Sequence, residues 1–138
     1  MADFGIIFDG FLSINGVDLS LKVMEFSADE GIEEPDATAW GVAARVSAPG
    51  LKTAGISVTF KQDYAPGSVD ATIAPLVANR TTFAVEWRPS DAVVGTSNPK
   101  RTGTFYVRSY NPIAGRVGDF NVARVELAPA SEVVRATA

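Results

Sequence analysis

The sequence contains no cysteine and no histidine among its 138 residues. Without cysteine, the chain can form neither a disulfide framework nor zinc–thiolate sites, and it has no thiol nucleophile. Without histidine, it lacks the side chain that most often acts as a general base or a metal ligand. Serine–histidine catalysis is thereby excluded. We therefore expect a protein that is not an enzyme and that uses no cofactor and no metal.

Long hydrophobic runs are also lacking, although 46% of the residues are hydrophobic. No segment reaches the ~20 apolar residues of a transmembrane helix. Asp3 and Asp9 stand where a signal peptide would carry bases. A chain of 138 residues suits one domain that buries about two-thirds of its unfolded surface. We expect a single soluble domain, residues 1–138, with no membrane partner.

Positive charge is scarce in the first quarter of the chain. Residues 1–36 contain nine acids and one base, whereas residues 37–138 contain seven acids and eleven bases, so the net charge of −4 combines two regions of opposite sign. Two such regions suit head-to-tail association of identical copies. They suit equally well a chain that folds its two regions against each other, and charge alone does not decide between these interpretations.

Alternation of apolar and polar residues predicts short strands along most of the chain. Asn15-Gly16 is a two-residue hairpin signal within residues 11–21. Five further segments alternate with a period of two: 23–30, 55–63, 82–88, 101–110 and 120–128. The side chains expected to face inward are Met24, Phe26, Ala28, Ile56, Val58, Phe60, Phe83, Val85, Trp87, Phe105, Val107, Ala123, Val125 and Leu127.

One segment, residues 68–79, has the period of a helix. Ser68 is a suitable N-cap, and Asp70 lies in the first turn, where a negative charge is favourable. Pro75 removes a backbone donor, so we expect a kink or two short turns there. The expected fold class is mainly antiparallel β, a β-sandwich or half-barrel with one short α-helix. The expected apolar stripe of the helix consists of Val69, Ile73, Leu76 and Val77.

Several short motifs invite a ligand-binding interpretation. The stretch 97–119 has two Asn-Pro pairs and the glycines Gly115 and Gly118. A phosphate loop would need a helix after the glycines, but a strand pattern follows, so turn chemistry is the better interpretation. The acidic stretch 29–36 lacks the spacing of a calcium loop. Residues 30–54 lack a clear period, and such a long irregular segment is often functional.

Three stretches together resemble a known family. They are DATAWG (36–41), APGLKTAGISVTFKQDYAPGSVDATIAPL (48–76) and TSNPKRTGTFYVRSYNPIAGRVGDFNVARVEL (96–127). Their order and spacing are similar to those of the major tail tube proteins of bacteriophages with long non-contractile tails. The resemblance extends over most of residues 11–135. The proline in the helix and the two phenylalanines near the N-terminus depart from the family pattern.

The resemblance implies a structural virion protein in the phage tail, made in the host cytoplasm. Such proteins form hexameric rings that stack into a tube, and their strands complete a larger barrel on ring assembly. DNA passes through the lumen without specific binding during genome ejection. The implied partners are further copies of the chain and the tape measure, tail terminator and distal tail proteins. The alternatives are another phage part, such as a capsid decoration or tail-end ring, and a stand-alone β-sandwich binding module.

The strand alternation and the long irregular segment, taken with the resemblance, suggest roles for segments and residues. Residues 1–10 and 128–138 would be terminal arms, and residues 30–54 would be a loop that lies on a neighbouring copy or, alternatively, folds over its own sheet with Trp40 as a lid on the core. The net charge suggests an acidic lumen, in which Lys61 would pair with Glu25 or Asp29. The lumen candidates are Glu25, Ser27, Asp29, Ser57, Thr59 and Lys61. The inter-subunit candidates are Glu30, Glu33, Glu34, Asp36, Trp40, Arg45, Lys52, Arg101 and Arg116, with Trp40 as an apolar anchor.

Overall fold

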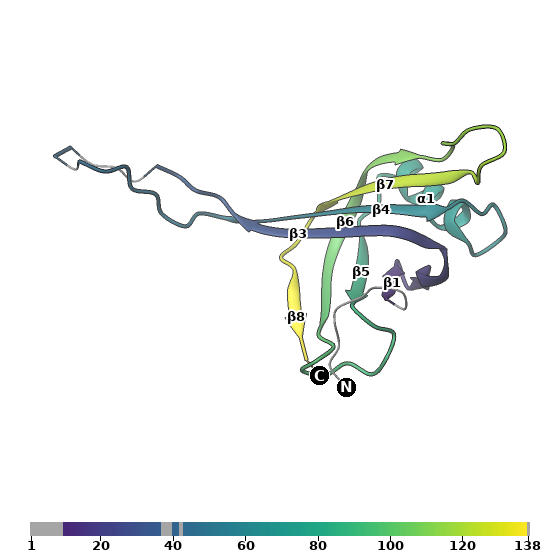
Figure 1. Cartoon of the computed structure of the whole chain (residues 1–138), viewed down its shortest axis with the longest axis horizontal. Helices are drawn as coiled ribbons and strands as arrows, with labels where there is room; N and C mark the ends of the chain where they lie inside the picture. Colours follow the sequence, from purple (N-terminus) through teal and green to yellow (C-terminus); the bar gives the residue numbers. More distant parts are fainter. Residues whose placement is uncertain (1–9, 37–39, 42, 138) are drawn as a thin grey trace.

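The computed structural model describes residues 10–36, 40, 41 and 43–137. It shows a β-sheet body from which one long hairpin projects (Figure 1). The expected N-terminal arm, residues 1–10, lies outside the described residues except for Gly10. The elements are β1 (Phe11–Ile14), β2 (Val17–Asp18), η1 (Ser20–Lys22), β3 (Val23–Ile32), β4 (Lys52–Lys61), α1 (Val69–Ala78), β5 (Phe83–Arg88), β6 (Lys100–Asn111), β7 (Val122–Pro129) and β8 (Val134–Ala136).

The strands form one antiparallel sheet in the order β2-β1-β5-β6-β7-β4-β3, and β8 adds to β6. Strand β6 connects two parts of this sheet, one that contains β5 and β8 and one that contains β7. Its residues 100–105 pair with β5 and β8, whereas its residues 105–111 pair with β7. The sheet bends so that β3 comes to face β5 across the core, where Phe26 contacts Trp87. The expected fold class, mainly antiparallel β with one short helix, is confirmed, and the bent sheet is a half-barrel.

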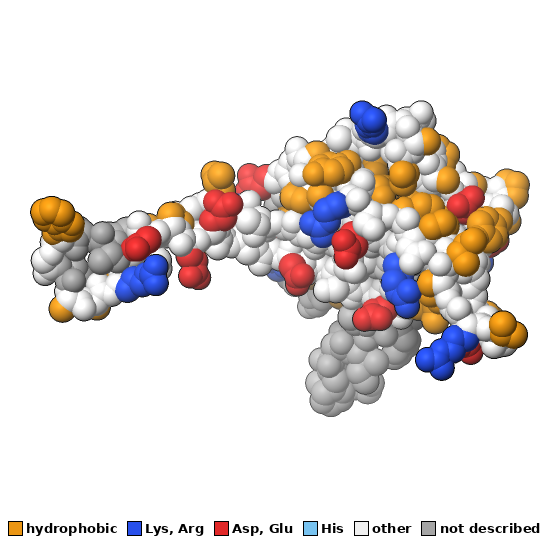
Figure 2. All heavy atoms as spheres, turned by 90° about the horizontal axis from the view of Figure 1, so that it is seen from above, with side chains coloured by type: hydrophobic (Ala, Val, Ile, Leu, Met, Phe, Trp, Pro, Cys, Tyr) orange, Lys and Arg blue, Asp and Glu red, His pale blue; other side chains and the backbone are white. Residues whose placement is uncertain are grey.

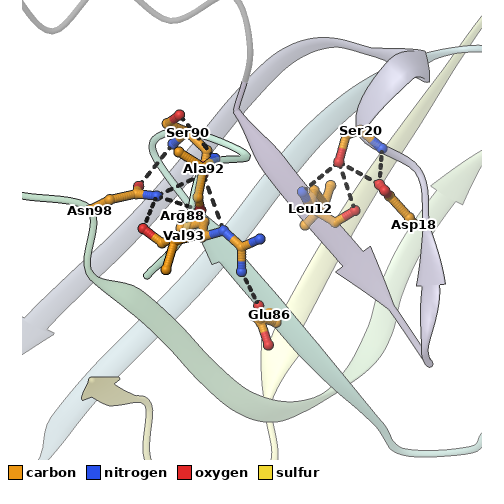
Figure 3. Close-up of polar contacts among 9 residues, drawn as sticks. All are labelled: Leu12, Asp18, Ser20, Glu86, Arg88, Ser90, Ala92, Val93 and Asn98. Atoms are coloured by element: carbon orange, nitrogen blue, oxygen red, sulfur yellow. Dashed lines mark hydrogen bonds and ion pairs between the residues drawn. The ribbon is translucent and has the colours of Figure 1, made fainter. Parts of the chain in front are cut away.

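The β1–β2 hairpin forms where Asn15-Gly16 predicts it. Asn15 has a φ of 52° and Gly16 a φ of 80°, and this pair of positive angles defines the type I′ turn that matches the twist of a hairpin. Ser20 then fixes the return of the chain (Figure 3): its Oγ accepts a hydrogen bond from the N–H of Leu12 at 2.9 Å and donates one to Asp18. The hairpin is thus attached to the start of β3.

Most of the predicted strand faces agree with the burial. Ile56, Val58 and Phe60 of β4 are buried, as are the inward residues predicted for β5 and β7. Met24 is the exception, because it is exposed while Val23 packs against the core. The register shifts between Val23 and Glu25, and such a bulge inserts one extra residue into the strand. The alternation in β3 therefore begins only after the bulge.

Aromatic side chains fill the centre of the half-barrel. The ring centroid of Trp87 lies 6.3 Å from that of Phe26 and 5.9 Å from that of Phe105, the latter in an edge-on arrangement. Both geometries are in the range that aromatic pairs prefer. Phe60 and Phe105 are among the largest fully buried side chains. This cluster joins β3 to β5 and β6, which are distant from it along the chain.

Helix α1 runs from residue 69 to residue 78 through Pro75 as one element, not as two short turns. Its buried residues are Val69, Thr72, Ile73 and Leu76. The predicted stripe was wrong at Val77, which is 42% exposed. A residue one position after Leu76 lies about 100° further around a helix of 3.6 residues per turn. Thr72 takes its place, because it lies three residues after Val69 and four before Leu76 on the same side.

Two features near β6 were not predicted. Strand β8 pairs with residues 100–102 of β6, so part of the expected C-terminal arm, residues 128–138, belongs to the sheet. Asn98, predicted as a simple turn residue, is nearly buried and holds the loop before β6 (Figure 3). Its Oδ1 accepts from the N–H of Ser90, and its Nδ2 donates to the carbonyl oxygens of Ser90, Ala92 and Val93 over 3.0–3.3 Å.

We predict that Leu76→Ala will lower the free energy of unfolding by about 2–5 kcal/mol, because it leaves a cavity beneath α1. Leu76 is 6% exposed and belongs to the core. Val77→Ala, a change on the exposed side of the same turn, should stay within about 0.5 kcal/mol of the unchanged protein. Urea denaturation followed by circular dichroism measures both. Equal effects of the two substitutions would show that α1 is not a core element.

Candidate functional site

The first candidate surface is the polar face of strands β3, β4, β7 and β6. All six lumen candidates lie on this face, opposite the core: all but the half-buried Thr59 are exposed, and their neighbours Phe26, Ile56, Val58 and Phe60 pack inward. The strand registers align them in rows across the sheet. One row is Glu25, Thr59, Arg124 and Asn111, and the next is Ser27, Ser57, Glu126 and Ser109.

The charge of this face differs from the expected acidic surface. Its exposed acids are Glu25, Asp29 and Glu126, and its exposed bases are Lys61, Arg108 and Arg124, so the two signs balance. One reason is that Glu33, Glu34 and Asp36 lie beyond the body, and Glu30 is paired with Arg101.

Lys61 also lies differently from the expectation that it pairs with Glu25 or Asp29. Thr59 stands opposite Glu25, and β3 begins at Val23, opposite Phe60, so no residue of β3 stands opposite Lys61. Its ammonium group lies 4.5 Å from the ring centroid of Phe120 instead, a distance typical of a cation–π contact.

The two sides of this four-stranded region are open edges. Strand β3 pairs with β4 on one side, and no strand among the described residues pairs with its other side. Residues 106–111 of β6 pair with β7 on one side, and within the described part of the chain their other side also lacks a strand partner. Open edges carry unpaired backbone donors and acceptors that favour pairing with a further strand.

The second candidate surface is the projecting hairpin, of which the structure describes residues 33–36, 40, 41 and 43–51 (Figure 1). The segment 30–54 is more regular than predicted, because its ends belong to β3 and β4 and backbone hydrogen bonds continue beyond them. Gly50 donates to the carbonyl oxygen of Glu33 at 2.8 Å, and Ala48 donates to that of Pro35 at 3.1 Å. Trp40 is fully exposed at 103%. It therefore does not cover the core of its own chain.

Ion pairs within the chain involve several of the inter-subunit candidates. Arg101 contacts Glu30 at 3.3 Å, and Arg45 contacts Asp36 at 3.6 Å. Lys52 donates to Glu132 at 2.5 Å, and this hydrogen bond raises the pKa of Lys52 and lowers the pKa of Glu132. The first and third pairs connect the base of the hairpin to the body. The side chains of Glu33, Glu34 and Arg116 are exposed.

The third candidate surface is the end of the body opposite the hairpin, where Figure 2 shows hydrophobic side chains gathered. Polar contacts shape the loops at this end. Gln62 Nε2 donates to the carbonyl oxygen of Pro112 at 2.8 Å and to Tyr110 Oη at 3.1 Å, and Tyr110 donates to Asp70 at 2.9 Å. Burial, the largest cause, raises the pKa of Tyr110 to about 12. The exposed apolar residues of these loops are Tyr64, Ile113, Val117 and Phe120.

Asp63 begins the loop that leads to α1. It accepts a hydrogen bond from the N–H of Ala65 at 3.0 Å and forms an ion pair with Lys22 at 3.0 Å. The backbone hydrogen bond, followed by the contact with Lys22, lowers the pKa of Asp63 from 3.8 to about 2. The carboxylate thereby connects the start of β3 to the loop before α1.

A cleft of about 640 Å³ lies between β1, the start of β3 and the end of β5. Its lining is largely apolar and includes Leu12, Met24, Phe26 and Trp87. This is where a stand-alone binding module would hold a ligand. Among the described residues, no group of three or more potential ligands is arranged to hold a metal ion. No helix in the described part of the chain is long and apolar enough to cross a membrane.

Comparisons with known proteins identify solved structures with a similar fold. No protein-family model and no curated protein matches the chain. A solved chain from the virion of a native gene transfer agent particle is 14% identical with a TM-score of 0.74, over 92% of this chain and 95% of that one. A chain from the tail of an empty particle of this type, with C6 symmetry, is 14% identical with a TM-score of 0.71, over 100% and 99%.

Hcp1 from Flavobacterium johnsoniae is a further match. It is 13% identical with a TM-score of 0.58, over 95% of this chain and 97% of its own. These similarities extend over nearly the whole of each chain. The protein therefore has the fold of these three structures.

We predict that Asp63 contributes to stability only above acidic pH. Because its pKa is lowered to about 2 in the folded protein, its contribution is present above the unfolded value of about 4 and is lost as the pH falls toward 2. Asp63→Asn should therefore lower the melting temperature at pH 6, and the difference from the unchanged protein should close toward pH 2. Lys22→Gln should reduce the same difference. A gap that does not change with pH would contradict this assignment.

Proposed function

We propose that this protein is the subunit of a tail tube, in which six copies form a ring and the rings stack around a hollow bore. The observation that carries the proposal is the four-stranded region β3-β4-β7-β6, which has a polar face and an open edge on each side. The C6 symmetry of the tail that contains a chain of the same fold supports the number six. The polar face and its open edges suit a structural role rather than a catalytic one.

The strand directions are compatible with a closed ring. Within the region each strand is antiparallel to the next, so β3 and β6 run in opposite directions. Copies related by rotation about the tube axis keep their strand directions. The β3 edge of one copy therefore meets the β6 edge of the next in antiparallel orientation. Four strands from each copy would close into one barrel, and a closed barrel has no edges.

The polar face would then line the bore, with the core residues and α1 on the outside. The serine and threonine side chains and the balanced charges would offer DNA phosphates no continuous positive surface, so the genome could pass without strong attachment. In this role the protein would belong to the virion tail after synthesis in the host cytoplasm. Its further partners would be the tape measure, tail terminator and distal tail proteins.

The hairpin would lie on a neighbouring copy. It projects beyond the body (Figure 1), and its exposed Trp40 and acidic Glu33 and Glu34 suit an interface with an apolar centre and a charged rim. A two-stranded ribbon alone is only marginally stable in water. The exposed Arg116 is a candidate partner for these acids, since Arg45, Lys52 and Arg101 already contact acids of their own chain.

Electron microscopy of concentrated purified protein tests the proposed function. We expect rings with sixfold symmetry or stacked tubes with a central channel. A protein that stays monomeric at every concentration in sedimentation would contradict the proposal and favour a binding module. Binding to capsid shells without tube formation would favour a decoration protein.

Exchange of backbone amide hydrogens tests the position of the hairpin. We predict that residues 43–51 exchange more slowly in the tube than in the monomer, where only the hydrogen bonds of the two-stranded ribbon protect them. Equal protection in the two states would rule out docking on a neighbour.

We also predict that Glu33→Lys combined with Glu34→Lys will impair assembly without unfolding the body. The effect should be larger at low salt, where like charges are screened least. Asp91→Lys provides a control, because this exposed acid lies in the loop after β5, away from the hairpin. Sedimentation velocity measures assembly, and circular dichroism verifies the fold. An equal loss of assembly in the control would attribute the effect to overall charge.

A further inference from the structure

We propose that Arg108 of one copy pairs with the acids Glu25 and Asp29 of a second copy where the two join side by side. The inference rests on the proposed function and adds to it the interaction that selects how neighbouring copies meet. Its basis is the uneven distribution of charge across the polar face. Acids lie on the strand at one open edge, and a base lies on the strand at the other.

Strand β3 carries the acidic side. Glu25 and Asp29 are both exposed on the polar face of this outermost strand. They are four residues apart, which corresponds to roughly 13 Å along a strand. Their neighbours across β4 are Thr59 and Gly55, which carry no charge. The one base on this face of β4, Lys61, lies over Phe120, and among the described residues neither Glu25 nor Asp29 forms an ion pair.

Strand β6 carries the basic residue, Arg108, which lies at a bulge in the strand. Val107 pairs with Leu127 and Ser109 pairs with Glu126, so Arg108 is the extra residue between them. Bulges near sheet edges commonly change the direction of a side chain. The side chain of Arg108 is 59% exposed and contacts Glu126 at 3.4 Å, a long distance for a charged hydrogen bond. Arg108 can therefore exchange this partner for another acid at little cost.

The antiparallel seam between copies brings these groups together. Residues opposite each other on adjacent strands have Cβ atoms about 5 Å apart, within reach of an arginine side chain and a carboxylate. The other two ways of joining open edges are disfavoured. Joining two β3 edges would place Glu25 and Asp29 of one copy against the same acids of the other. Joining two β6 edges would likewise oppose Arg108 to itself. Charge thus favours the head-to-tail join that closes a ring.

Charge exchange provides the test. Arg108→Glu, and separately Glu25→Lys with Asp29→Lys, should each raise the protein concentration needed for half-assembly about tenfold or more, because each opposes like charges at every seam. All three substitutions together restore opposite charges and should recover most of the lost assembly. Arg108→Gln, which removes the charge without reversing it, should have an intermediate effect. Sedimentation velocity over a range of concentrations measures assembly, and circular dichroism confirms folding.

The matched control is Arg124→Glu. Arg124 is an exposed arginine on the same face, one strand inward from the β6 edge. Its reversal should affect assembly much less than that of Arg108. Equal effects of the two reversals, or failure of the triple variant to recover, would overturn the proposed pairing.

A failure of the pairing can be distinguished from a failure of the proposed function. If the unchanged protein forms no rings, both the proposed function and the pairing are wrong. If rings form normally with Arg108→Glu, only the pairing is wrong. If the reversals of Arg108 and Arg124 leave assembly unchanged but equally weaken retention on immobilised DNA, the bases contact phosphates instead, and the pairing is again overturned.

Discussion

The contact of Trp87 with Phe26 and Phe105 holds the bent sheet in shape. Phe26 lies on β3, the last strand of the sheet, and Trp87 lies on β5, the third strand from the other end of the strand order. Packing their rings brings the two parts of one sheet face to face, and the buried side chains of β4, β7 and α1 fill the space between them. The side of β3, β4, β7 and β6 that faces away from these rings is polar, and among the described residues no strand pairs with its two edges.

These features leave several surfaces of the single chain exposed. Its core is well formed, yet two edges, one hairpin and one apolar end are exposed. Each of these features is costly or hazardous for an isolated soluble protein, because open edges and apolar patches favour association. Their arrangement is regular: the edges lie on opposite sides of one face, whereas the hairpin and the apolar end lie at opposite ends of the molecule (Figure 2). In the proposed tube, lateral and axial contacts would thus use different surfaces.

The sequence predicted the parts of the fold that a simple period determines. Ile56, Val58 and Phe60 face the core because β4 alternates without interruption beside β7. Prediction failed at Met24, because a bulge inserts a residue that no period reveals. It also failed for the hairpin, whose strands have no buried face to impose alternation. Such failures occur where tertiary structure, rather than local pattern, determines the conformation.

For the candidate site, the sequence predicted the faces of the strands but not the partners of the charges. Glu30 and Arg101 are 71 residues apart, and Lys52 and Glu132 are 80 residues apart, so only the order of the strands brings them together. The balanced polar face has the same origin. A net charge gives a sum over the chain, whereas the surface depends on which acids lie on the hairpin and which lie on the body. The role of Asn98 depends on a loop conformation that the Asn-Pro pair alone does not specify.

The position of β6 in both parts of the sheet has a consequence for how the molecule loses its structure. One half of this strand completes the region with the polar face, and the other half completes the region around β5 and β8. Detaching β5 breaks the hydrogen bonds of residues 101–105, and detaching β7 breaks those of residues 105–111, so either loss leaves half of β6 without its neighbour. The two halves therefore form a single cooperative unit rather than two that open independently. In the proposed tube, a subunit that unfolds as one unit would resist local opening under load.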